Sequence, residues 1–122
     1  MKLDHINLTV RNVVEAGTFL KKHFGYRDMF EDNNAGMAAL EDGSGLSVLL
    51  MKGSDASYPK YFHVGFDVET EENVNAFHEK LVADGMEIDP PEHEAWGSYT
   101  FNFKCPGGDF LIEVACATGN WT

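Results

Sequence analysis

The sequence predicts an α+β fold of two βαβββ modules in tandem, and two observations support it. Residues 3–10 (LDHINLTV) are repeated in character at 61–68 (YFHVGFDV). In both, a histidine is followed by apolar residues at its first, third and fifth neighbours, the alternation of a half-buried strand. Each copy then leads into apolar residues at helical spacing and ends at a glycine, Gly25 or Gly85, as a left-handed helix stop does. We therefore expect each module to form a curved mixed sheet with one helix outside, and the pair to form a concave cup.

The first module is expected over about residues 1–53. It should begin with a strand over 2–10 and a helix over 13–24, for which Asn12 is the N-cap and Glu15 completes a capping box. Three strands should follow, over 25–31, 37–41 and 45–51, separated by turn formers at 32–36 and by the hairpin signal at 42–43.

The second module is expected over about residues 61–117, after a linker at 54–60 that contains serine, aspartate and proline and follows Gly53. We expect a strand over 61–69, the N-cap Thr70 and a helix over 71–84. The remaining elements are a strand from Met86 broken by Pro90-Pro91, a loop at 92–97, a strand over 98–104, a turn at 105–109 and a strand over 110–117.

Composition limits the classes of partner. The 122 residues suit a single domain, and the net charge of −11 argues against nucleic acid or an anionic membrane as a partner. No apolar run approaches the ~20 residues of a membrane span, and the first residues lead directly into a strand rather than a signal peptide. Cys105 and Cys116 are too few for a disulfide framework. We expect a cytoplasmic protein whose cysteines are free, packed thiols.

Several polar and aromatic side chains are candidates for a site. His5 and His63 point away from the apolar face of their strands, and Asn7 and Thr9 share the face of His5 as candidate substrate contacts. Tyr99 and Phe101 alternate along a later strand, where they would either line a pocket or fill the core. We keep both as candidate substrate contacts.

Two such halves, with a histidine early in the first strand of each and Pro106-Gly107-Gly108 before a last strand that carries Glu113, resemble the vicinal oxygen chelate superfamily. This is the group of glyoxalases, bleomycin and fosfomycin resistance proteins and extradiol dioxygenases. The resemblance covers nearly the whole chain. It implies a metal site built from the two first-strand histidines and a last-strand carboxylate of each half. His5, His63 and Glu113 match three of these places, and the fourth falls in 48–51, which holds no carboxylate.

The donor set agrees with that implication. Two imidazoles and one carboxylate suit Mn(II), Fe(II), Ni(II) or Zn(II), and three protein ligands leave positions open for substrate or water. The turn before Glu113 is one residue longer than the family pattern. Because Ile112 and Val114 are apolar, we expect them to be buried and Glu113 to face the cavity. Glu113 and the loop residue His93 are the candidate catalytic acid or base groups, although an exposed histidine without function would read the same way.

The residues discriminate among the activities of the family. Glyoxalase-like isomerisation would need a second glutamate. A fosfomycin-modifying transferase would need a cationic pocket, but the nine residues after Glu113 include no Lys or Arg. Extradiol cleavage would fit the ligand set, but Asn102 replaces the expected tyrosine. Bleomycin-type sequestration would need no metal and would suit the acidic charge.

We therefore expect a metal-dependent lyase, isomerase or dioxygenase-like enzyme. Its small substrate would chelate one divalent metal ion through two oxygens. The alternative is a metal-free protein that sequesters a small aromatic or cationic ligand. The resemblance also implies a homodimer, in which His5 would meet His63 and Glu113 either of its own chain or of the partner subunit.

Overall fold

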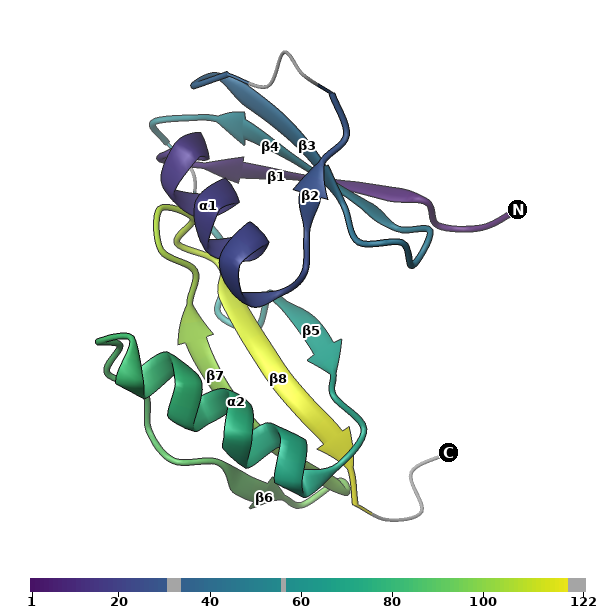
Figure 1. Ribbon diagram of the computed structural model, residues 1–122, viewed down its shortest axis with the longest axis vertical. Helices are drawn as coiled ribbons and strands as arrows, with labels where there is room; N and C mark the ends of the chain where they lie inside the picture. The colour runs from purple at the N-terminus through teal and green to yellow at the C-terminus, as the bar shows by residue number, and fades with distance from the viewer. Residues whose placement is uncertain (31–33, 56, 119–122) are drawn as a thin grey trace. The chain divides into compact units, whose positions relative to one another are not determined.

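The computed structural model describes residues 1–30, 34–55 and 57–118, and these form two compact units (Figure 1). Unit 1 combines residues 1–59 with the short segment 105–109. Unit 2 contains residues 60–104 and the chain from residue 110 onward. Each unit holds one helix and one four-stranded sheet.

The sheet of unit 1 has the strand order β1-β4-β3-β2. Strand β1 runs parallel to β4, while β3 is antiparallel to both of its neighbours. Helix α1 contacts β3 and β4, and therefore covers one face of the sheet. The elements are β1 (His5–Val10), α1 (Val13–His23), β2 (Arg27–Asp28), β3 (Met37–Glu41) and β4 (Ser47–Lys52).

The sheet of unit 2 repeats this topology as β5-β8-β7-β6, with β5 parallel to β8 and the other pairs antiparallel. Helix α2 contacts β7 and β8 (Figure 1). The elements are β5 (His63–Asp67), α2 (Glu71–Ala83), β6 (Glu92–Glu94), β7 (Ser98–Lys104) and β8 (Leu111–Ala117). The tandem βαβββ fold class predicted from the sequence is confirmed.

The helix boundaries follow from side chains near their ends. The Asn12 side chain accepts the N–H of Glu15 at 2.9 Å, and Thr70 accepts the N–H of Asn73 at 3.1 Å, so both predicted N-caps are present. Gly25 and Gly85 both adopt the left-handed conformation, with φ of +74° and +97°. None of the described helices is long and apolar enough to cross a membrane.

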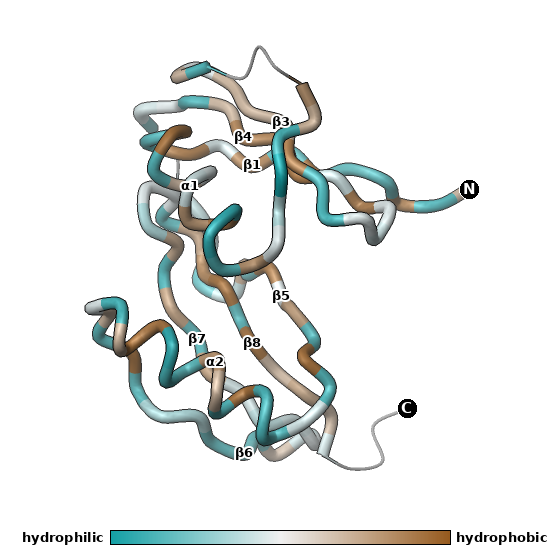
Figure 2. Tube along the Cα trace, viewed as in Figure 1, coloured by the Kyte–Doolittle hydropathy of each residue, from teal (hydrophilic) through white to brown (hydrophobic). Residues whose placement is uncertain are grey.

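Hydrophobic residues collect between each helix and its sheet. In unit 1 the buried apolar residues of β1 alternate with exposed ones, as predicted, and α1 buries one face over β3 and β4. In unit 2 the fully buried Val74 and Leu81 of α2 lie over a sheet that buries Ile112 and Val114. Figure 2 shows the resulting alternation of hydrophilic and hydrophobic residues along both helices.

Two strand predictions need correction. The strand expected from Met86 does not form, and β6 lies instead at Glu92–Glu94, where a loop was expected. Proline lacks the N–H that a ladder needs, so pairing starts only after Pro90-Pro91. The strand expected at 25–31 is reduced to Arg27–Asp28 over the residues that are described, because only these two pair with β3.

The turn between β7 and β8 packs with unit 1. The Gly107 carbonyl accepts the N–H groups of Arg11 and Asn12, both at 3.0 Å, and the Arg11 Nε–H donates to Asp109 Oδ2 at 3.1 Å. A short piece of the C-terminal half thereby completes the unit built from the N-terminal half.

Candidate functional site

The face of the unit 2 sheet opposite α2 carries a hollow of about 770 Å³. It is lined by residues from β5 and β8 together with the start of β7 and the turn before it: His63, Gly65, Phe66, Asp67, Trp96, Ser98, Glu113, Ala115, Cys116 and Ala117. The size is typical of a small-molecule site. The lining places two of the predicted metal ligands, His63 and Glu113, in one cavity.

His63 and Glu113 approach each other because of the strand register. Gly65 pairs with Glu113, which places His63 one row along the same face of the parallel pair. The His63 Nε2 atom lies 3.5 Å from Glu113 Oε2, and both side chains are partly exposed. The longer turn before β8 does not shift the strand, because Ile112 and Val114 are buried and Glu113 is on the opposite face.

The hydrogen bonds of His63 orient its ring for a cation. Its Nδ1 atom is 3.0 Å from the Tyr61 carbonyl oxygen, which can only accept a hydrogen bond, so Nδ1 carries the hydrogen. In the neutral ring Nε2 then presents a lone pair to the Glu113 carboxylate. Two acceptors facing each other require a proton or a metal ion between them, so the residues fit a metal ion.

His5 has the same arrangement in unit 1. Its Nδ1 atom lies 2.6 Å from Asp4 Oδ1, so Nδ1–H donates to a carboxylate and Nε2 is the free ring nitrogen. Asn7 and Thr9 are exposed on the same side of β1 as His5. The Asn7 amide contacts Met51 Sδ at 3.1 Å, and the Thr9 carbonyl accepts the hydroxyl of Tyr58 at 2.6 Å.

The register also identifies the residue at the fourth ligand place. Leu49 pairs with Asn7 in β1–β4 as Glu113 pairs with Gly65 in β5–β8. The first module therefore has a leucine where the second has its carboxylate. Within either unit, the described residues hold no group of three His, Cys, Asp or Glu side chains that would bind an ion.

Tyr99 and Phe101 do not line the hollow. The Tyr99 hydroxyl donates to Asn75 Oδ1 of α2 at 2.6 Å, and the Phe101 ring lies 5.2 Å from that of His78, also on α2. Side chains alternate between the two faces of β7. Asn102 lies on the face of Glu113, so Tyr99 and Phe101 lie on the opposite face, toward the helix. They are therefore part of the packing between helix and sheet, as the core interpretation of this strand expected.

His93 also lies on the helix side. It pairs with Tyr99 across β6–β7, its ring is 4.6 Å from the Tyr99 ring, and its Nε2 is 3.3 Å from Glu71 Oε2 at the start of α2. The structure thus separates His93 from Glu113 by the thickness of the sheet, so it is not positioned to act as acid or base at the hollow.

Two residues of the open face were missed in the sequence. Asn102 is exposed directly opposite Glu113, and Ser98 lines the hollow although it is 5% exposed. The alternation of β7 separates these residues from Tyr99 and Phe101. It does not show which set faces the helix, because that depends on the register across the turn.

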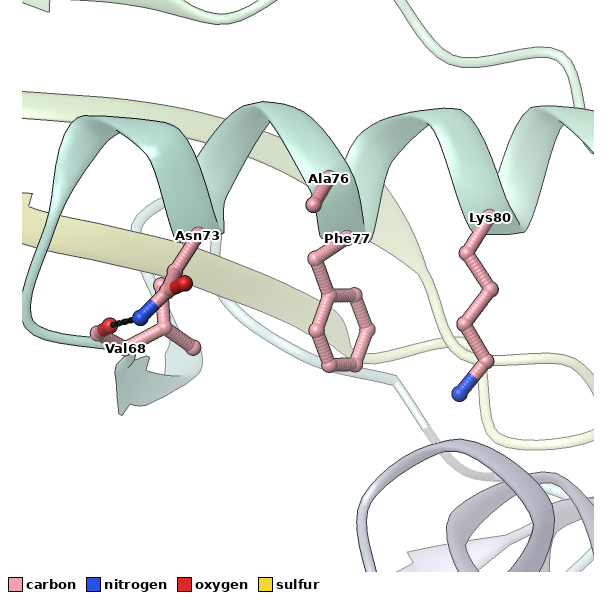
Figure 3. Close-up of a pocket in the computed structure, with 5 residues that line it drawn as sticks. All are labelled: Val68, Asn73, Ala76, Phe77 and Lys80. Carbon is pink, nitrogen blue, oxygen red and sulfur yellow. Dashed lines mark hydrogen bonds between the residues drawn. The ribbon is translucent and has the colours of Figure 1, made fainter.

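A second, smaller hollow of about 340 Å³ lies along α2 (Figure 3). Figure 3 shows Phe77 and Lys80 projecting from the same side of the helix, and the Asn73 amide donates to the Val68 carbonyl at 2.8 Å. The Lys80 ammonium lies 5.5 Å from the centre of the Phe77 ring. No residue predicted for the site lines this hollow.

The chain belongs to the Glyoxalase/Bleomycin resistance protein/Dioxygenase superfamily, whose family model matches residues 2–114. A similar solved structure is that of a possible glyoxalase from Bacillus cereus. It is 44% identical, covers 95% of this chain and 99% of that chain, and has a TM-score of 0.85.

A fosfomycin resistance protein, FosX, from Listeria monocytogenes serovar 1/2a is 26% identical over 124 residues, which cover 95% of this chain and 90% of that protein. A structure of FosX from Listeria monocytogenes, complexed with Mn(II) and sulfate ion, has a TM-score of 0.77. It is 22% identical and covers 96% of this chain and 90% of that chain, and it supports the same fold.

Proposed function

We propose that this protein is a metal-dependent enzyme whose small substrate chelates one divalent ion held by His5, His63 and Glu113. The observation that carries the proposal is the His63 Nε2 atom at 3.5 Å from the Glu113 carboxylate, with Nδ1 already occupied by a carbonyl. A neutral imidazole and a carboxylate in that relation can share a metal ion. The Mn(II) bound to the related FosX supports a metal in this fold.

His5 would supply the third ligand through its own free Nε2 atom. Neither unit holds three suitable side chains among its described residues, so the set requires His5 of unit 1, from the same chain or from a second copy. A homodimer would allow either assembly. With three protein ligands, the remaining positions are open to two substrate oxygens.

The chemistry follows from that arrangement. Mn, Fe, Ni or Zn at this place would act as a Lewis acid and stabilise negative charge on a substrate oxygen. Glu113 would hold the ion with one oxygen and leave its second beside the substrate. Asn102, directly opposite Glu113, would donate its amide N–H to a substrate oxygen. These roles would suit a lyase, isomerase or dioxygenase whose reaction proceeds through an enolate or oxyanion.

The alternative function is metal-free binding of a small aromatic or cationic ligand. One property of the hollow favours this alternative. Its described lining includes Asp67 and Glu113 but no Lys or Arg, so it would suit a cationic ligand. The same lining argues against a phosphonate such as fosfomycin, because nothing but a metal would balance its charge.

Metal content separates the two functions. We would measure it by elemental mass spectrometry in protein purified without a histidine tag or chelator, for the wild type, His63→Ala and His93→Ala. His93 is the matched control, since it also pairs with a glutamate but on the helix side. We expect close to one ion per chain in the wild type and His93→Ala, and loss in His63→Ala. No ion in the wild type, even after incubation with each metal, would contradict the enzymatic proposal.

A further inference from the structure

We propose that the end of the hollow remote from His63 binds a primary ammonium group of the substrate, through Asp67, Trp96 and Ser98. The inference rests on the proposed function only in taking this hollow as the substrate site. It adds a substrate class: a small molecule with a chelating oxygen end and a cationic nitrogen at the other end.

The floor of the hollow leaves space between these ends. Gly65, which has no side chain, lies between His63 and Asp67 on β5, and Ala115 and Ala117, with a single methyl each, lie level with Asp67 and one row beyond it on β8. Asp67 pairs with Ala115, one row beyond the pair of Gly65 with Glu113. Two residues along and one strand across place the Asp67 and Glu113 Cα atoms roughly 8 Å apart. One small molecule can therefore reach both carboxylates.

The Asp67 carboxylate keeps an oxygen for a ligand. Its Oδ1 atom accepts the backbone N–H of Glu69 at 2.9 Å, and no Lys, Arg or His among the described residues forms an ion pair with it. Its neighbours in the lining are small or apolar apart from Ser98. A carboxylate in a cavity whose described lining holds no Lys or Arg favours a cationic ligand group.

Ser98 supplies the second polar group of this end. It lines the hollow while being 5% exposed, and within the described part of the chain its hydroxyl makes no hydrogen bond. Its oxygen is open to the hollow rather than fully buried, so a ligand or water in the hollow can form a hydrogen bond with it. Serine accepts as well as donates, so it can take an N–H of an ammonium group.

Trp96 supplies an aromatic face. It sits in the tight turn before β7, closed by the Gly97 N–H donating to the Glu94 carbonyl at 3.1 Å, and it is 73% exposed although it lines the hollow. A cation over an indole face is attracted by the ring electrons. Carboxylate, hydroxyl and indole together match an ammonium that has N–H donors.

A structural role of Asp67 must be separated from this binding role. Its bond to the Glu69 N–H supports a residue with φ of +76°, just before the N-cap Thr70. Asn has the same side-chain oxygen and preserves that bond while it removes the charge. Asp67→Asn is therefore the informative variant. Asp89→Asn makes the same charge change at an exposed position outside the lining.

The test is calorimetric titration of metal-free and metal-loaded protein with 2-phenylethylammonium and with its neutral counterpart 2-phenylethanol. We expect the wild type and Asp89→Asn to prefer the ammonium by about tenfold in Kd, and Asp67→Asn to lose the preference while binding 2-phenylethanol unchanged. Equal affinity for the two probes in the wild type, no binding of the ammonium at millimolar concentration, or a preference retained in Asp67→Asn would overturn the inference.

The outcomes also separate this inference from the proposed function. A preference that depends on Asp67 in a protein that binds no metal would leave the cation subsite standing and refute the metal-dependent enzyme. One bound metal ion per chain, with no preference for the ammonium over the alcohol, would support the metal-dependent enzyme and refute the cation subsite. Thermal unfolding of Asp67→Asn, expected to match the wild type, excludes a folding defect as the cause of lost binding.

Discussion

The backbone N–H of Asn12 donates to the carbonyl oxygen of Gly107 at 3.0 Å, and these residues are 95 positions apart in the sequence. Asn12 caps α1, so the helix starts where the β7–β8 turn meets it. Gly107 adopts φ of +77°, which favours glycine, and its Cα faces the helix closely enough that a Cβ would be 2.9 Å from both the Asn12 carbonyl oxygen and the Glu15 Cβ.

Gly107→Ala should therefore destabilise the protein strongly. The left-handed backbone costs about 1 to 2 kcal/mol for alanine, and the contact with a backbone oxygen adds about 1 to 3 kcal/mol. Gly43→Ala is the matched control, because Gly43 also has a positive φ of +87° but a Cβ there would meet nothing within 4 Å. Urea unfolding should show a clearly larger loss for Gly107→Ala. Equal losses would mean that the close approach does not matter.

His5→Ala should remove the metal as completely as His63→Ala. In both histidines Nδ1 contacts an oxygen acceptor, which leaves Nε2 as the nitrogen that could bind an ion, so we assign them the same role. Elemental analysis of the two variants side by side checks this. An ion retained at full occupancy in His5→Ala would remove His5 from the ligand set, while His63 and Glu113 would remain.

Phe101→Leu should lower stability without affecting metal content. Phe101 is 3% exposed and packs against His78, so the smaller side chain should cost about 1 kcal/mol of unfolding free energy. Its neighbour Asn102 gives the opposite expectation: Asn102→Ala, at an exposed position, should change stability by less than about 0.5 kcal/mol. Loss of metal in Phe101→Leu at a temperature where it is folded would place this ring in the site after all.

Stability should fall at alkaline pH. Burial, reinforced by the carboxylates of Glu15 and Asp109, raises the pKa of Cys105 from 9.0 to about 12, and burial followed by Asp42 raises that of Tyr26 to about 12. Between pH 9 and 12 the unfolded chain loses the Cys105 proton that the folded chain keeps. Unfolding therefore releases a proton, and the free energy of unfolding falls by up to about 1.4 kcal/mol per pH unit for this group.

Urea midpoints of the wild type and Cys105→Ala at pH 8 and pH 10 measure the effect. The wild type should lose more stability between the two pH values than the variant does. The contribution of Cys105 is fully present below pH 9 and disappears as pH approaches 12. An identical loss in both proteins would show that this thiol does not carry the dependence.

The sequence predicted the fold well because local signals agreed with one another. The repeated alternation after His5 and His63, the caps Asn12 and Thr70 and the glycine stops all describe short-range structure. Their agreement in two copies was enough to fix the tandem topology. The placement of Glu113 beside His63 followed from the same alternation, once Ile112 and Val114 were taken as buried.

The remaining parts depended on register, which single strands do not reveal. For Tyr99 and Phe101 the sequence left pocket and core both open, because aromatic alternation marks a face of the strand without showing which side of the sheet it is on. The sequence predicts a loop at His93, because Pro90-Pro91 interrupts the expected strand, whereas strand pairing begins directly after the two prolines. Whether His5 joins His63 and Glu113 is a matter of how separate units assemble, and it stays a prediction.

The position of residues 105–109 in unit 1 has a consequence for synthesis on the ribosome. In unit 1 the junction between β1 and α1 contacts the turn at residues 105–109, which is translated after residue 104. Until that turn has been translated, the N–H groups of Arg11 and Asn12 at the start of α1 lack their acceptor, the Gly107 carbonyl oxygen. Contacts of such long sequence separation form late and slowly. The nascent chain therefore completes unit 1 only after residue 109 has been translated, together with unit 2 rather than before it.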